Sequence, residues 1–458
     1  MSAEATATRA PTGPGPTTVL ARRIQGIRYD ALPPAVVQVA RQCVLDWIAV
    51  TLRAADEPLV RMLAEQVLAE GGKAQASLVG LGARVSVRQA ALVNGAASHA
   101  LDYDDVNVRM TGHPTVAVLP AALALAQSNG ASGKDLLAAF TAGYETVCLV
   151  GGMVSPGHYA RGFHVTGTVG TFGAAAACAH LLRLNTGQTL TALGIAGTQA
   201  AGLKSMFGTM CKPLHAGKAS ENGLLAAQLA ARGFTARPDV LECAQGFAAT
   251  QTDTFDPDVA ADTRYNLPDN LFKYHASCYQ THAAIEAIRS LRAEHRFSAS
   301  DVDRVVLRHD AGADTVCNIP TPKSGLETKF SLRMLTAYAL LGIDTADIDS
   351  YTDERTQLPE LTVLRDKVSV RFTAGWPITR SEVAILLSDG RELFAAHDSG
   401  VPETNLDRQT ERLVEKFNSL AGPRLGGSRT RSVIDTVLSL EQLPDVRALT
   451  ELLESIEQ

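Results

Sequence analysis

The feature that most constrains this chain is a polar segment, His99 to Pro114, placed between two largely apolar stretches at residues 91–97 and 116–126. The segment holds three carboxylates, two histidines and an arginine: Asp102, Asp104, Asp105, His99, His113 and Arg109. Burying an ionisable group without a partner costs roughly several kcal/mol. Because the flanks favour burial, we expect a paired site whose groups have perturbed pKa values.

Helical spacing of apolar residues dominates the first two thirds of the chain. It predicts two or three helices over residues 19–69, one over 86–101, one from Pro120 and one over 186–203. Ser132 to Asp135 matches a capping box in front of a helix. Small residues recur in two further predicted helices, 165–182 and 213–232, which can therefore pack closely. We expect no strand before residue 266.

Alternating patterns appear later in the chain. Val302–His309 and Val368–Phe372 are predicted strands, and Glu382–Ala396, with Asp389-Gly390 at its centre, is a predicted hairpin. Helices are expected at about 275–294, 330–341 and from 405 to the end. The fold class is therefore mainly α: an all-helical domain from residues 19–266 and 400–458, an inserted α+β lid domain at 267–399, and a disordered tail at 1–18.

Composition excludes several classes of function. The formal net charge is -6 and no basic patch is present, so nucleic acid and anionic membranes are not expected partners. No apolar run is long enough for a membrane span, and residues 1–18 lack the apolar core of a signal peptide. The seven cysteines are scattered without a CxxC pair, which favours a reduced, cytoplasmic location.

Basic residues precede or open several predicted helices. His113 stands before Pro114, His164 before the helix at 165, and Lys212 before Pro213. Free N–H groups and the helix dipole at such ends attract carboxylates. A single residue of this kind is more often an ordinary cap, but together, with Arg109 and Lys273 as further candidates, they predict a site for a small polyanionic acid.

The aspartate cluster Asp102-Tyr-Asp-Asp105 allows three interpretations. Carboxylates bind Mg²⁺ or Ca²⁺, but no second ligand motif accompanies them. A DxDD acid of the terpene-cyclase kind needs an aromatic cavity, and aromatic residues make up only 5% of the chain. General acid–base chemistry is the interpretation we favour. The glycine-rich stretch 167–173 follows no strand, so no dinucleotide site is predicted. We therefore expect neither metal nor cofactor.

The motifs together resemble those of the MmgE/PrpD family, which includes 2-methylcitrate dehydratase, cis-aconitate decarboxylase and iminodisuccinate epimerase. The similar segments are Ala100–Asp105, Gly112–Pro120, Gly162–Gly173, Lys212–Gly217, Phe272–His275 and Lys329–Leu332. The resemblance implies a large helical domain made from both chain ends, an inserted lid, a homodimer, and a metal-free site between the domains.

Carried over by motif, the resemblance implies catalytic roles for five residues: Asp102, His113, His164, Lys212 and Lys273. Arg109, His215 and Tyr159 are predicted substrate contacts. Val106 and Met334 occupy positions where the family often has Thr and Tyr, so two hydroxyls are missing.

The reactions of the family build negative charge on a carbon next to a carboxylate. The resemblance favours, in order, a hydro-lyase similar to 2-methylcitrate dehydratase, an epimerase of a dicarboxylate such as iminodisuccinate, and a decarboxylase of the cis-aconitate type. The substrate is a small di- or tricarboxylic acid. The absent hydroxyls at Val106 and Met334 keep a non-catalytic binding paralogue open as a fourth alternative.

Overall fold

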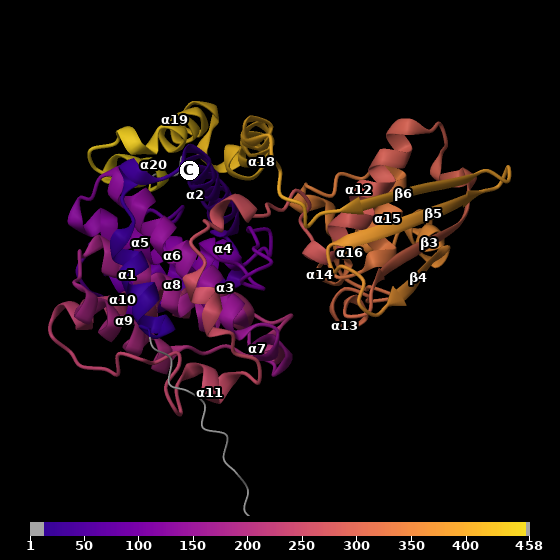
Figure 1. The fold of residues 1–458 in the computed structure, drawn as a ribbon. Coiled ribbons are helices and arrows are strands. Elements are labelled where there is room, and N and C mark those ends of the chain that lie inside the picture. Colours follow the sequence, from indigo (N-terminus) through magenta and orange to yellow (C-terminus); the bar gives the residue numbers. More distant parts are fainter. Residues whose placement is uncertain (1–12, 455–458) are drawn as a thin grey trace, which may run out of the picture. The chain divides into compact units, whose positions relative to one another are not determined.

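The computed structural model describes residues 13–454, which divide into two compact units. The helical unit comprises the residues up to Ala100, then Asn107–Pro268, then Arg424 onward. The sheet unit comprises Leu101–Val106 and Asp269–Pro423. The fold is mainly α, as the sequence predicted (Figure 1). The division differs from the predicted domain bounds in three places, because residues 101–106 and 400–423 lie in the sheet unit and residues 267–268 lie in the helical unit.

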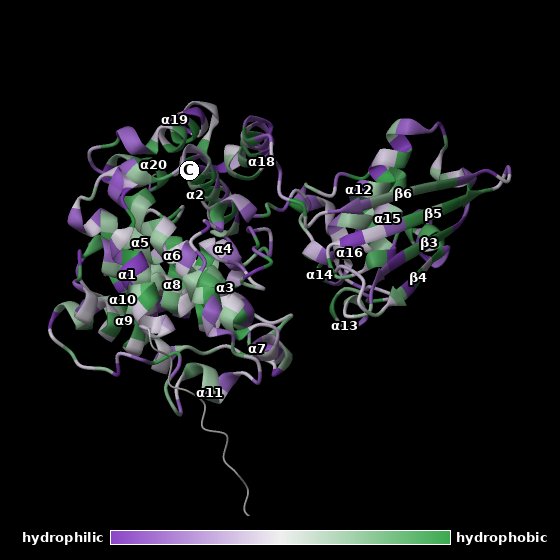
Figure 2. Cartoon of the chain, viewed as in Figure 1, coloured by the Kyte–Doolittle hydropathy of each residue, from purple (hydrophilic) through white to green (hydrophobic). Residues whose placement is uncertain are grey.

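The helical unit contains most of the helices of the chain. They are α1 (Pro16–Gly26), α2 (Pro34–Ala54), α3 (Pro58–Glu70), α4 (Val87–His99), α5 (Thr115–Asn129), α6 (Gly133–Val154), α7 (Gly157–Ala160), α8 (Val165–Leu181), α9 (Thr186–Gln199), α10 (Cys211–Ala231), α11 (Phe247–Gln251), α19 (Gly427–Leu438) and α20 (Arg447–Glu454). In its interior α8 packs against α6, α5 and α10, and α10 also packs against α4. Figure 2 shows how hydrophobic α5 and α8 are, and every residue of α8 from Val165 to Ala179 is buried.

Two apolar helices of this unit, α2 and α6, are long enough to cross a membrane. Their most apolar windows are 78% and 94% buried inside the protein. Such burial is typical of core helices in a folded domain.

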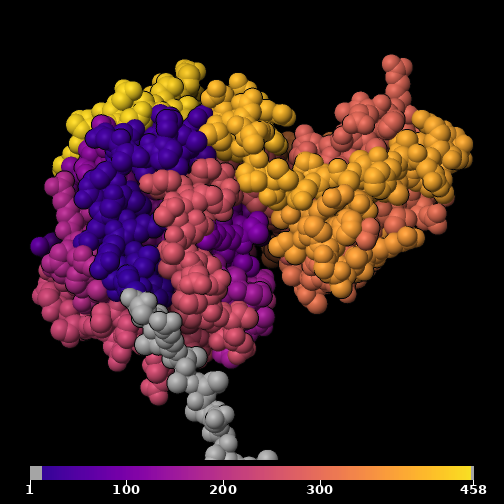
Figure 3. Space-filling model, viewed as in Figure 1, coloured from indigo at the N-terminus to yellow at the C-terminus, as the bar shows by residue number. Residues whose placement is uncertain are grey.

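On one face of the unit, α1 lies beside the segment that contains the short helix η3 (Pro257–Ala261), as Figure 3 shows in indigo and salmon. Two chain segments more than two hundred residues apart are thereby joined.

The sheet unit has one four-stranded sheet, ordered β4-β3-β5-β6. Its strands are β3 (Val302–Asp310), β4 (Val368–Thr373), β5 (Arg380–Leu387) and β6 (Glu392–Asp398), with β3 and β4 parallel and the other pairs antiparallel. Helices α12 (Tyr279–Glu294) and α15 (Leu332–Leu341) contact each other and the sheet. The remaining helices are α13 (Ala313–Val316), α14 (Gly325–Thr328), α16 (Asp353–Thr356), α17 (Pro359–Asp366) and α18 (Leu406–Leu425), the last of which continues across the unit boundary.

Three expectations about the elements need correction. A short antiparallel hairpin, β1 (Ala76–Leu78) with β2 (Ala83–Val85), lies within the region predicted to be wholly helical. Pro120 does not begin a helix but lies inside α5, which starts at Thr115. Residues 16–18, expected in the disordered tail, are the first turn of α1. Residues 1–12 of that predicted tail lie outside the described residues.

Candidate functional site

Four histidines of the helical unit lie together: His99, His113, His164 and His215. We call them the histidine cluster. The ring centroid of His99 is 4.5 Å from that of His113 and 5.8 Å from that of His164. The rings of His164 and His215 have centroids 5.3 Å apart, and their Nδ1 atoms are 3.0 Å apart. The structure thus groups three of the residues predicted from sequence and adds His99.

The ends of the core helices position these side chains. His99 is the last residue of α4, His164 is the N-cap of α8, and Lys212 and His215 lie near the start of α10. His113 precedes α5, and its backbone N–H donates a 3.1 Å hydrogen bond to Thr166 Oγ1 on α8. The sequence prediction that basic groups gather at helix starts therefore holds for α8 and α10.

Glycine residues explain how closely these helices approach. A Cβ on Gly95 of α4 would lie 2.8 Å from the Cα of Gly217 on α10. A Cβ on Gly223 of α10 would lie 2.5 Å from the Ala174 side chain on α8. Real Cβ atoms do not tolerate such contacts, so any larger residue at either glycine would push the helices apart. Close packing of α4, α8 and α10 is what brings the histidine cluster together.

The electrostatic environment of His164 favours a neutral ring. Burial lowers its pKa well below the usual value, and the nearby His99, Lys212, His113 and His215 lower that pKa further. Only 3% of His164 is exposed. A neutral imidazole at a positive helix end can donate its N–H to a developing negative charge without first being protonated. Lys212 is close by, with Nζ 5.4 Å from the Phe207 ring centroid, and that ring lies 5.0 Å from His164.

Buried neutral histidines give the protein a predictable response to acid. Burial lowers the pKa of seven histidines below the ordinary value of 6.5: His158, His164, His180, His215, His275, His282 and His309. Below pH 6.5 the unfolded chain binds more protons than the folded one, so the free energy of unfolding falls as the pH decreases toward the lowered pKa values.

We therefore expect the urea midpoint of unfolding to be lower at about pH 5.5 than at about pH 7.5, at constant ionic strength. The charge of Glu286 does not change between pH 5.5 and pH 7.5, because its pKa is lowered to about 2. Burial raises that pKa, but the neighbouring His275, Arg289 and Arg412 lower it by more. A midpoint that stayed constant or rose on acidification would contradict the burial of neutral histidines.

A second group of polar side chains lies in the sheet unit. Lys273 is 1% exposed, and its Nζ is 3.2 Å from Asp102 Oδ1 and 2.5 Å from the Asp102 carbonyl oxygen. Asp102 has a φ of 51°, in the left-handed region that non-glycine residues rarely adopt. The pair joins two of the residues for which the family resemblance implies catalytic roles.

The backbone around Asp102 is fixed from two sides. Val106 N–H donates to the Leu271 carbonyl at 2.9 Å, and Leu271 N–H donates to the Val106 carbonyl at the same distance. Lys416 on α18 donates a 2.8 Å hydrogen bond to the Tyr103 carbonyl oxygen. These contacts hold the strained residue in place, so the carboxylate of Asp102 has a defined position relative to Lys273 within the sheet unit.

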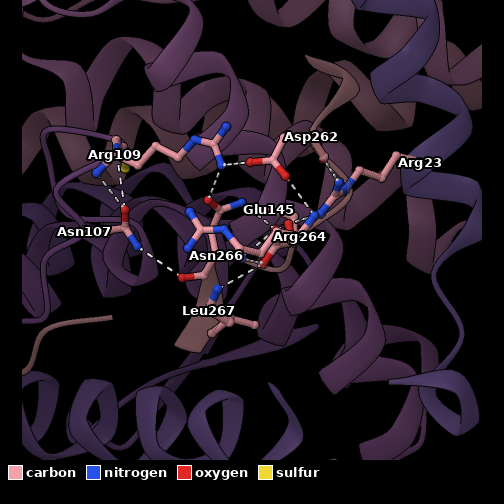
Figure 4. Close-up of polar contacts among 9 residues, drawn as sticks. Arg23, Asn107, Arg109, Glu145, Asp262, Arg264, Asn266 and Leu267 are labelled. Carbon is pink, nitrogen blue, oxygen red and sulfur yellow. Dashed lines mark hydrogen bonds and ion pairs between the residues drawn. The ribbon is translucent and has the colours of Figure 1, made fainter. Parts of the chain in front are cut away.

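Arg109, predicted to contact substrate, takes part in a different network (Figure 4). Its Nη1 donates to Asp262 Oδ2 at 2.6 Å and to Asn266 Oδ1 at 2.7 Å. At the centre of the network is Glu145 on α6, whose side chain is 1% exposed. Glu145 accepts hydrogen bonds from the Asn266 backbone and side chain, from Leu267 N–H, and from Arg23. These contacts give Arg109 a structural explanation that needs no substrate.

The other predicted residues lie as follows. Tyr159 is on α7, with Lys204 Nζ 3.5 Å from its ring centroid, and its role as a substrate contact stays a prediction. Val106 forms the backbone bridge to Leu271, and Met334 is completely buried in α15. Neither supplies the hydroxyl that the family often has at its position.

Sequence reasoning missed three residues. His99 belongs to the same polar segment as His113, and its position three residues before Asp102 was a usable signal. Lys416 and Glu145 gave no local signal: each is one charged residue within an amphipathic or apolar helix, and its partners are 313 and 121 residues away in sequence.

The fold and these side chains define a mainly helical protein with a histidine and lysine cluster at helix ends and a smaller α+β unit inserted in the chain. Residues 18–260 match the MmgE/PrpD N-terminal domain, and residues 275–442 match the MmgE/PrpD C-terminal domain. The chain belongs to the MmgE/PrpD family.

Named relatives are similar over nearly the whole chain. Cis-aconitate decarboxylase of Homo sapiens is 29% identical over 463 residues, covering 96% of this chain and 94% of the relative. Cis-aconitate decarboxylase of Mus musculus is 27% identical, covering 96% and 93%. The Aspergillus terreus enzyme of the same name is 27% identical, covering 96% of both chains. A decarboxylase is a lyase, so the similarity supports an enzyme of this broad class.

Proposed function

We propose that this protein is a lyase that removes carbon dioxide from a small tricarboxylic acid of the cis-aconitate type. The observation that carries the proposal is the histidine cluster, in which His164 and His215 stand with Lys212 at the starts of α8 and α10. The named decarboxylases cover the chain almost completely and favour this outcome over the dehydration that the sequence ranked first. Dehydration by a hydro-lyase is the second candidate.

The proposed reaction follows from the charges of the site. When the bond between the carbon and the leaving carboxylate breaks, the electron pair stays on the carbon and carbon dioxide departs. Lys212 and the helix starts stabilise that negative charge, an electrostatic contribution that is often the largest in catalysis. A proton from His164 then forms the new C–H bond. Lys212 and the positive end of α8 stabilise the ring after it has given up the proton.

We propose that Asp102 and Lys273 act on the same substrate. Lys273 would bind a carboxylate that is retained in the product, and Asp102 would hold the ammonium group in place through its 3.2 Å contact. In a dehydration, Asp102 or His113 would instead remove an α-proton, and a donor would have to protonate the departing hydroxyl.

Proton NMR in deuterated water tests the proposal. The purified protein is incubated separately with cis-aconitate, 2-methylcitrate and iminodisuccinate. We expect carbon dioxide release and one deuterium incorporated at carbon from cis-aconitate alone. Water loss from 2-methylcitrate would establish the hydro-lyase, and α-deuteration of iminodisuccinate with inversion would establish the epimerase. Ligand binding without any turnover would establish the binding paralogue and overturn the proposal.

The homodimer and the cytoplasmic location, both expected from the sequence, stay predictions. Sedimentation of the purified protein tests the first of them.

A further inference from the structure

We propose that His215 is a positioning residue that fixes the tautomer of His164, holding the proton of that neutral ring on Nε2. This inference deepens the proposed function, because protonation of the carbon requires His164 to donate an N–H. A neutral imidazole has one proton shared between two nitrogens, and it can donate from Nε2 only while Nδ1 acts as an acceptor. The hydrogen-bond partner of Nδ1 therefore determines whether His164 can donate a proton from Nε2.

Only one proton can lie between the Nδ1 atoms of the His164 and His215 rings. Nδ1 of His164 and Nδ1 of His215 are 3.0 Å apart, a hydrogen-bond distance that needs one donor and one acceptor. Burial lowers the pKa of both imidazoles, so both rings are neutral at pH 7. If His215 donates from Nδ1, the proton of His164 must reside on Nε2. The two tautomers are thus coupled.

The surroundings of His215 favour the donating arrangement. His215 lines a cavity of about 270 Å³ in the helical unit, whose lining also includes the exposed Leu203 and Lys218. A water molecule in this solvent-accessible cavity can donate to Nε2 of His215 and so leave the proton of that ring on Nδ1. His164, in contrast, is 3% exposed.

The backbone holds the ring pair in register. A Cβ on Gly167 would lie 3.0 Å from the His215 Cβ, and a Cβ on Gly202 would lie 3.4 Å from His215 Nδ1. Gly202 also accepts a 3.0 Å hydrogen bond from the backbone N–H of His164. Gly202 has a φ of 148°, so a side chain there would be strained as well as crowded. Both glycines leave room for the imidazole of His215 at a fixed distance from His164.

The test compares His215→Asn with His215→Ala. The side-chain amide of asparagine can place an N–H near the position of the histidine Nδ1–H, so H215N should keep a donor to His164, whereas H215A removes it. We expect H215A to lower kcat by about 10²-fold with little change in KM, and H215N to recover most of that loss. Added imidazole should restore activity to H215A, because a cavity of roughly 150 Å³ already admits a benzene-sized ring.

His180 provides the matched control. It is another partly buried histidine of the helical unit, with Nε2 3.0 Å from the Ile27 carbonyl oxygen, at the far end of α8 from His164. His180→Ala should leave kcat unchanged, and added imidazole should have no effect on it. Circular dichroism of each variant establishes that the helices are intact.

Nitrogen NMR of ¹⁵N-histidine-labelled protein without substrate separates this inference from the proposed function. We expect His164 to be protonated on Nε2 in the parent protein and in H215N, and to show mixed tautomers in H215A. A His164 ring protonated on Nδ1 in the parent protein, or an H215A variant with unchanged kcat, would overturn the inference. A parent protein that shows the expected tautomer but releases no carbon dioxide would overturn the proposed function alone.

Discussion

Lys212→Ala is expected to reduce the rate of carbon dioxide release by about 10³-fold while leaving the fold intact, because removal of one group that stabilises transition-state charge costs roughly 10²–10³ in rate. Lys212 is the second residue of α10, where the helix dipole and free N–H groups add to its charge. Its Nζ lies 5.4 Å from the centroid of the Phe207 ring, which is itself 5.0 Å from the ring of His164 in the histidine cluster. Steady-state kinetics on cis-aconitate measures the loss.

Lys134→Ala is the control for this prediction. Lys134 is likewise the second residue of a long helix in the helical unit, α6, but it is exposed and pairs with Asp30 at 2.8 Å. Solvent screens an exposed ion pair, so this variant should be as active and nearly as stable as the parent. Equal activity of the Lys212→Ala and parent proteins would remove Lys212 from the site and, with it, the charge stabilisation on which the proposed function depends.

Local signals predicted many of the elements correctly. The capping box at Ser132 and Asp135 opens α6, with both of its hydrogen bonds present. Asp389-Gly390 forms the turn between β5 and β6, and Gly390 has a φ of 87°. In each case a few neighbouring residues determine the conformation, because the hydrogen bonds that fix it are made within the same short segment.

Elements that depend on distant contacts were missed. The hairpin of β1 and β2 is held by side chains from elsewhere: Gln127 accepts from Ser77 N–H at 2.9 Å, and Asn94 accepts from Val79 N–H at 3.0 Å. Pro120 resembled a helix start, but α5 continues through it within a fully buried environment. Tertiary packing outweighed the local preference in both places.

The candidate site, like the fold, was predictable only where a residue lies in a recognisable local motif. Motif spacing identified His113, His164 and Lys212, because each stands at a helix end with a recognisable flank. The same reasoning placed Arg109 at the site from its position in the polar segment alone. Its actual partners, Asp262 and Asn266, are 153 and 157 residues away, and no local pattern indicates them.

Glu145→Gln should destabilise the helical unit by about 3–5 kcal/mol, the usual cost of removing one partner from a buried charged pair. The carboxylate accepts from Asn266 N–H at 2.8 Å, from Asn266 Nδ2 at 2.7 Å and from Leu267 N–H at 3.1 Å, and it pairs with Arg23 at 3.0 Å (Figure 4). An amide in its place keeps one acceptor oxygen but turns an N–H₂ group toward these donors. Burial raises the pKa of Glu145, and the surrounding donors oppose that effect.

The measurement uses the two tryptophans of the chain. Trp47 is buried in α2 of the helical unit, and Trp376 is in the sheet unit, so a Trp376→Phe background leaves fluorescence that reports the helical unit alone. Glu441→Gln is the control, since Glu441 pairs with Arg41 at 3.1 Å near the surface and should cost about 0–1 kcal/mol. Equal urea midpoints for the two glutamine variants would contradict the prediction.

A double-mutant cycle of Glu145→Gln and Asn266→Ala measures whether the two side chains stabilise the helical unit together or independently. Asn266 Nδ2 donates directly to Glu145, and Asn266 Oδ1 accepts a hydrogen bond from Arg109. If the network is one unit, the double variant should lose less stability than the two single variants together, with a coupling of about 0.5–3 kcal/mol.

Asn107 Nδ2 also donates to the Asn266 carbonyl at 3.3 Å, so the same network fixes the loop that leads to His113. Loss of Glu145 should therefore lower kcat even at temperatures where the variant is still fully folded, because His113 depends on that loop for its position.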